Sequence, residues 1–184
     1  MRLFMTIALA FTFFTQMEVA AVIFKPVPGM RLKPRIFLIW PAAVVIVAHS
    51  ANAFIEFWQV VLGTLGLLMS LVLFHWARQT IRGKFFSYLS SGDRPEFICM
   101  AGPYAWIRNP FYASYLIAYF TAVFLMPDEI TALVFLVMVW LFCSAAVDEE
   151  KKFLDSPLAE AYQEYMAHTG RFFPKVVQSV RLHL

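Results

Sequence analysis

Residues 130–150 read ITALVFLVMVWLFCSAAVDEE, an apolar run that stops at three successive carboxylates, Asp148, Glu149 and Glu150. A membrane-spanning helix needs about 20 mainly apolar residues, with a range of about 17–25. We therefore interpret residues 130–147 as a membrane helix that ends at the carboxylates. This run decides the fold class, because the rest of the chain repeats its pattern.

Four earlier apolar runs have the same character. The run closest to residue 130 is short, and we expect it to lengthen by recruiting flanking residues. Gly63 and Gly66, in the third run, are expected to let a neighbouring helix approach closely. The sequence thus predicts an all-α, polytopic membrane protein with about five transmembrane helices in a single domain, residues 1–184. The four earlier runs are 3–24, 36–54, 57–77 and 111–126.

Composition agrees with a lipid-facing bundle. Of 184 residues, 61% are hydrophobic and only 15% charged, whereas a soluble domain carries about a quarter charged residues. The net charge of +3 is small and the basic residues are dispersed along the sequence, which argues against a nucleic-acid partner. Cys99, Cys143 and four scattered histidines have neither disulfide nor metal-ligand spacing, so no metal site is predicted.

The first run has a second interpretation, since Val19-Ala20-Ala21 resembles a signal-peptidase site. However, only Arg2 precedes the run, and the apolar stretch exceeds a normal signal-peptide core and continues past the possible cut. We expect it to be retained as a membrane helix.

The positive charges are strongly partitioned. In a five-span topology every lysine and arginine except Arg2 falls on one side, in the loop after the first run, in the connector 78–110 and in the segment after residue 147. The positive-inside rule then places the amino terminus outside and the carboxy terminus in the cytoplasm. The connector 78–110 and the tail 148–174 should therefore lie together at the cytoplasmic face.

The end of the connector carries features of a ligand site. Gly102-Pro103 indicates a tight turn in which the backbone can approach a ligand. Asn109-Pro110 is typical of a helix start, with proline at the first helical position and asparagine suited to cap it. Arg108 could hold a carboxylate there, or it could simply anchor the chain at the membrane interface.

The tail begins with the carboxylates of residues 148–150. Such groups can accept hydrogen bonds from ribose hydroxyls or from an ammonium group. The alternative is a solvated charge run that only terminates the preceding helix.

Taken together, the two segments resemble the isoprenylcysteine carboxyl methyltransferases and phospholipid N-methyltransferases. Residues 102–112, GPYAWIRNPFY, are similar to the family pattern G-x-Y-x-x-x-R-[HN]-P-x-Y. Glu149-Glu150, followed by Tyr162 and Tyr165 and closed by the RFFP of residues 171–174, is similar to the second family motif. The resemblance covers residues 85–175.

The resemblance implies a cytoplasm-facing pocket for S-adenosylmethionine, formed by the connector 78–110 and the tail 148–174. Arg108 is the implied catalytic candidate. Aromatic faces at Tyr104 or Tyr112 would suit the cationic sulfonium of the cofactor. The implied cofactor-binding residues are Glu96, Phe97, Ile98, Cys99, Gly102, Tyr104, Asn109, Pro110, Phe111, Tyr112, Glu149 and Glu150.

The implied activity is S-adenosylmethionine-dependent methylation of a small or lipophilic acceptor, a carboxylate, amine or thiol, at the cytoplasmic face of the lipid bilayer. Two positions depart from the family. Ala146 stands where the isoprenylcysteine branch has an arginine, which argues against a prenylcysteine acceptor. Asn109 stands where many members have histidine.

Two other functions stay open. The sterol reductases carry a similar motif, G-x-[FY]-x-x-x-R-H-P-N-Y, and bind NADPH, but Phe111 replaces their asparagine and this chain is shorter. A non-catalytic membrane scaffold could keep the same fold. Glu18, inside the first run, is either a group facing the acceptor or a structural hydrogen-bonding residue. His75 is either a proton acceptor or an interfacial residue.

Overall fold

The computed structural model describes residues 1–23, 39–81, 95 and 97–175, with only the backbone of residues 18–23. The described residues form helices and no named strand, which confirms the all-α prediction. The elements are α1 (Arg2–Ile23), α2 (Ile39–Ser50), α3 (Phe57–Thr80), the short 3-10 helix η2 (Gly102–Ala105), α4 (Pro110–Leu125), α5 (Glu129–Leu154) and α6 (Ala159–His168).

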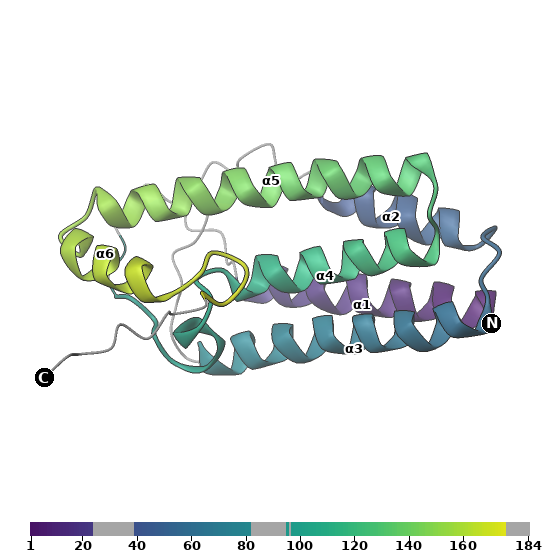
Figure 1. Ribbon diagram of the computed structural model, residues 1–184, viewed down its shortest axis with the longest axis horizontal. Helices are drawn as coiled ribbons and strands as arrows, with labels where there is room; N and C mark the ends of the chain where they lie inside the picture. The colour runs from purple at the N-terminus through teal and green to yellow at the C-terminus, as the bar shows by residue number, and fades with distance from the viewer. Residues whose placement is uncertain (24–38, 82–94, 96, 176–184) are drawn as a thin grey trace, which may run out of the picture.

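The first five α-helices lie side by side and alternate in direction (Figure 1). The amino terminus, the start of α3 and the α4–α5 turn lie at the right-hand end of the view, and α6 lies at the left-hand end. The most extensive helix contact joins α3 and α4, and α1 packs on α2, α3 and α4. We call the right-hand end the turn end and the left-hand end the site end.

Two glycines of α3 make its close contact with α4 possible. A Cβ atom on Gly63 would lie 2.6 Å from Cδ2 of Leu125, and one on Gly66 would overlap the hydroxyl of Thr121. The prediction that Gly63 and Gly66 admit a neighbouring helix is therefore confirmed.

The outer faces of the long helices are apolar. α3 and α5 are each long and apolar enough to cross a membrane, whereas α2 and α4 are shorter apolar helices. Large side chains such as Leu65 and Val72 on α3, and Leu133 and Leu136 on α5, are more than half exposed. Apolar exposure on this scale is unusual for a protein surrounded by water and suits one surrounded by lipid.

Three predicted boundaries need correction. α2 ends at Ser50 rather than at residue 54, because the chain turns there and the Asn52 amide donates to the His49 carbonyl at 3.1 Å. α4 does not lengthen beyond its 16 residues. Pro127 disfavours a helical conformation for Met126, whose φ and ψ are −137° and 81°.

The third correction concerns α5, which continues through the carboxylates to Leu154 instead of ending before them. Glutamate and lysine are good helix formers, and the positive charges of Lys151 and Lys152 in the last turn interact favourably with the negative end of the helix dipole. The helix therefore carries Glu149 and Glu150 past its apolar part. Glu150 is buried rather than solvated.

Candidate functional site

At the site end, a short piece of the tail lies against the end of the connector. We call residues 169–171 the strap. Its Gly170 forms an isolated parallel bridge with Ile107. The Arg108 amide donates to the Gly170 carbonyl at 2.8 Å, and the Gly170 amide donates to the Trp106 carbonyl at 3.1 Å. The expectation that the ends of connector and tail lie together is confirmed for these residues.

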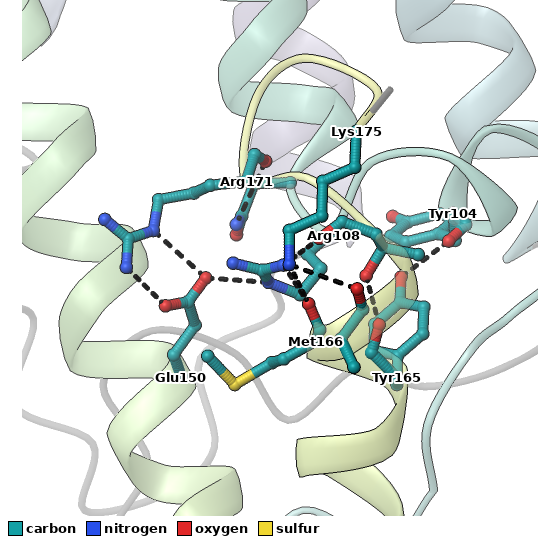
Figure 2. Close-up of polar contacts among 10 residues, drawn as sticks. Tyr104, Arg108, Glu150, Tyr165, Met166, Arg171 and Lys175 are labelled. Atoms are coloured by element: carbon teal, nitrogen blue, oxygen red, sulfur yellow. Dashed lines mark hydrogen bonds and ion pairs between the residues drawn. The ribbon is translucent and has the colours of Figure 1, made fainter. Parts of the chain in front are cut away.

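A carboxylate between two arginines joins the strap to α5 (Figure 2). Arg108 Nε donates to Glu150 Oε1 at 2.9 Å. Arg171 donates from Nε to the same oxygen at 3.1 Å and from Nη2 to Oε2 at 2.6 Å. The Glu150 cluster, made of Arg108, Glu150 and Arg171, thus connects three segments that are distant in the sequence.

Burial makes this cluster important for the local structure. The side chains of Glu150 and Arg108 are only 5% and 7% exposed. Burial alone would raise the pKa of Glu150, which lies beyond the apolar run, but hydrogen bonds from Arg171 and Arg108 outweigh it and lower that pKa. The same bond raises the pKa of Arg171. The carboxylate therefore stays ionised, and removing it would strand a buried cation.

Arg108 is used mostly within the protein. Besides its bond to Glu150, its Nη1 donates to the carbonyls of Thr169 and Met166. These contacts hold the end of α6 and the strap to the connector. Arg108, which the sequence predicted as catalytic, is thus buried and hydrogen-bonded to Glu150, Met166 and Thr169.

The start of α4 supplies the next part of the site. Pro110 occupies the first turn, as predicted, and Asn109 is the N-cap residue. However, the Asn109 side chain makes no capping hydrogen bond, which corrects the expectation that it caps the helix. Its backbone amide and its Nδ2 donate instead to the Arg171 carbonyl, at 3.1 and 3.4 Å.

The first turn of α4 also contacts α5. The Tyr112 hydroxyl donates to Glu149, one residue before the Glu150 cluster. The Tyr112 ring stacks on Phe142 with a centroid distance of 5.3 Å. Phe111 is buried and packs edge-on against Phe74 of α3. Aromatic packing thus fixes the position of Tyr112 beside Glu149.

η2 brings Tyr104 to the same end. Gly102 has a φ of 56°, a left-handed conformation suited to glycine, which confirms the predicted turn. Tyr104 is buried, and burial raises the pKa of its hydroxyl. Its carbonyl accepts a 2.6 Å hydrogen bond from the Tyr165 hydroxyl, which ties η2 to α6.

The remaining predicted residues differ in how far the structure describes them. Cys99 is buried, and Phe97 and Ile98 are half-buried in irregular backbone. Glu96 and the side chain of Glu18 lie outside the described part. His75 is half-buried on α3, with its ring against Phe74.

Two parts of the site were not predicted from the sequence. Arg171 was predicted only as the start of the RFFP motif, and α6 was not predicted at all. The spacing of Tyr162 and Tyr165, both buried on one face of α6, was the available signal for that helix.

The architecture defines a class: a helical membrane protein with a polar, ion-paired site at one end of its bundle. Within that class, the model of the phospholipid methyltransferase family matches residues 58–162, more than half of the chain. The protein belongs to this family and is a membrane methyltransferase. The match contains η2, α4 and α5 and ends before the strap. Searches of curated proteins and of solved structures found no match.

Proposed function

We propose that the protein is an S-adenosylmethionine-dependent methyltransferase for a small or lipophilic acceptor with a carboxylate, amine or thiol. The observation that carries the proposal is the Glu150 cluster, which fastens the strap and α5 to the motif at residues 102–112. Membership of the phospholipid methyltransferase family supports the reaction class.

The side chains at the site end suit the chemistry of this cofactor. Its methionine carboxylate needs cationic or N–H donors, which the start of α4 and the arginines of the cluster offer. Its ammonium and ribose hydroxyls need acceptors, and Glu149 is a half-buried carboxylate beside Tyr112. The cofactor-binding set proposed from the sequence is retained, with Glu96 outside the described residues.

The residues of the chain would contribute mainly positioning. When bound, S-adenosylmethionine supplies an electrophilic methyl group on a sulfonium. Arg108 and Glu150 hold the strap against the start of α4. Tyr165 fixes the position of Tyr104, and Glu149 and Phe142 fix that of Tyr112. We therefore assign Arg108 a positioning role rather than direct contact with the reacting atoms.

The proposed membrane arrangement is a single domain of five spans with an outer amino terminus. In it, the segments 78–110 and 148–174 face the cytoplasm, and an acceptor soluble in the bilayer reaches the site from the side. The alternating helix directions (Figure 1) and the exposed apolar faces of α3 and α5 support this arrangement.

A thermal-stability assay in nanodiscs tests the function. S-Adenosylmethionine and S-adenosylhomocysteine should raise the melting temperature, because a ligand at 100 times its Kd stabilises by about 2.7 kcal/mol. NADPH should not. Stabilisation by NADPH alone would identify a reductase, and no response to any of the three would identify a scaffold. Either result would overturn the proposal.

A further inference from the structure

Arg171 differs from Arg108 in how much of its side chain is exposed. The Arg171 side chain is 38% exposed, against 7% for Arg108. Both are bonded to Glu150, but Arg108 also donates to two carbonyls of the α6–strap segment. Arg171 is thus the member of the cluster that a ligand can reach.

The pairing with Glu150 prepares Arg171 for a second anion. Its Nε and Nη2 hold the two carboxylate oxygens, which fixes the plane of the guanidinium. Nη1 makes no hydrogen bond with any residue that the structure describes, so it remains a donor. Two arginines share one carboxylate, which leaves an excess of one positive charge in the cluster.

The neighbouring helix start adds to this charge. The backbone amide and the Nδ2 of Asn109 both donate to the Arg171 carbonyl, and the Asn109 side chain does not cap α4. The 16-residue helix therefore begins beside the strap with its positive dipole end uncapped by a side chain. Arg171 and the start of α4 meet through this contact.

We propose that Arg171 binds an oxyanion of one of the two substrates. This inference rests on the proposed function and assigns a binding residue to its site. Two sources share the required chemistry: the carboxylate of the methionine moiety of the cofactor and the phosphodiester of a phospholipid acceptor. A guanidinium whose plane is already fixed offers paired donors to either group.

The test compares Arg171→Gln with the wild type in binding assays that do not depend on turnover. The first pair of probes is S-adenosylhomocysteine, which has the carboxylate, and 5′-methylthioadenosine, which lacks it. The second pair is dihexanoyl phosphatidylethanolamine and dihexanoylglycerol, which lacks the phosphate. Lys175→Gln is the matched control, because Lys175 is an exposed cation that bonds to the carbonyls of Met166 and Ala167 and not to Glu150.

We expect Arg171→Gln to weaken one oxyanion-bearing probe by at least about tenfold while its oxyanion-free partner is unaffected. Loss confined to S-adenosylhomocysteine identifies the carboxylate, and loss confined to the phospholipid identifies the phosphodiester. Equal affinities in variant and wild type for all four probes would overturn the proposal. Equal weakening of all four would also overturn it, because it would show a purely structural role.

If Arg171→Gln does not fold, a competition experiment on the wild-type protein tests the same proposal. Sodium sulfate should compete with the oxyanion-bearing probe and leave its partner unchanged, at matched ionic strength in sodium chloride. Insensitivity to sulfate would overturn the proposal. If neither nucleoside probe binds the wild type, the methyltransferase proposal fails, whereas an Arg171-dependent response to the phospholipid would still support the oxyanion site.

Discussion

At each end of the bundle a carboxylate contacts a basic side chain, but the two contacts differ in burial. At the turn end, His49 Nε2 lies 3.0 Å from Asp128 Oδ2, with the side chains 35% and 31% exposed. At the site end, Glu150 is 5% exposed and accepts from two arginines. Exposed pairs contribute little to stability because water screens them, whereas breaking a buried pair leaves an uncompensated charge.

The difference reflects two separate uses of a carboxylate. Asp128 begins α5: its Oδ1 accepts from the amides of Ile130 and Thr131 at 3.0 and 3.1 Å, and His49 is an additional partner. Glu150 instead accepts from two arginines of other segments, Arg108 just before α4 and Arg171 of the strap. At the turn end Asp128 caps a helix within its own segment. At the site end Glu150 links residues that are distant in the sequence.

Glu150→Ala should have the largest effect. Because it leaves Arg108 buried without its carboxylate, we expect the strap to lose about 3–5 kcal/mol of local stability while the helices persist. Hydrogen exchange at the Arg108 and Gly170 amides should accelerate more than about 100-fold, with an unchanged far-ultraviolet circular dichroism spectrum. Stabilisation by S-adenosylhomocysteine should be lost as well.

Glu164→Ala, on the exposed face of α6, is the matched control and should leave that exchange unchanged.

The pH dependence of strap stability is a second test of the role of Glu150. The folded-state pKa of Glu150 is lowered from 4.5, so its stabilisation is fully present above pH 4.5 and is lost as pH falls through the lower folded value. A strap equally protected in Glu150→Ala and wild type would contradict the proposed difference between the ends.

Tyr165→Phe should have an intermediate effect. The change removes the 2.6 Å hydrogen bond to the buried Tyr104 carbonyl, which should cost about 1–3 kcal/mol because an acceptor loses its partner. Thermal unfolding in detergent measures it. Tyr162→Phe is the control, since the Tyr162 ring stacks on Phe153 and its hydroxyl makes no hydrogen bond within the described residues. Equal losses in both variants would refute the assigned role of the Tyr165 hydroxyl.

His49→Ala should have the smallest effect, a loss of about 0–1 kcal/mol, because water reaches this partly exposed contact and Asp128 keeps its contacts to α5. Asp128→Ala should cost more, about 0.5–2 kcal/mol, because it also removes the helix cap. Chemical unfolding of the two variants measures the order. A His49→Ala loss as large as that of Glu150→Ala would erase the contrast between the ends.

Hydrophobic pattern and turn chemistry were sufficient to predict much of the fold. They located α1, α3 and α4 to within a few residues and identified Gly63, Gly66 and Gly102 as special positions. They failed where tertiary contacts decide the outcome. The run of carboxylates was predicted to end the fifth helix, but α5 continues through it. The two arginine partners of Glu150 come from distant segments and could not be read from the local sequence.

The site followed the same division. Residues 102–112 and Glu149-Glu150 were predicted because each resembles a contiguous motif of the family. The hydrogen bonds of the strap were not predicted, because they join residues about 60 positions apart and depend on backbone atoms that any sequence possesses. Arg171 became a candidate only when its exposure could be compared with that of Arg108.

The continuity of α5 makes the spacing between residues as important as their identity. Phe142, Ala146 and Glu150 follow one another at four-residue intervals on a single buried stripe. The Phe142 ring stacks on Tyr112 and Tyr115 and so fixes the rotation of α5 about its axis. That rotation determines the direction in which the Glu150 carboxylate points, one helical turn beyond Ala146. Inserting one residue between Phe142 and Glu150 would turn the carboxylate by about 100° and aim it away from both arginines, although every side chain of the site would still be encoded.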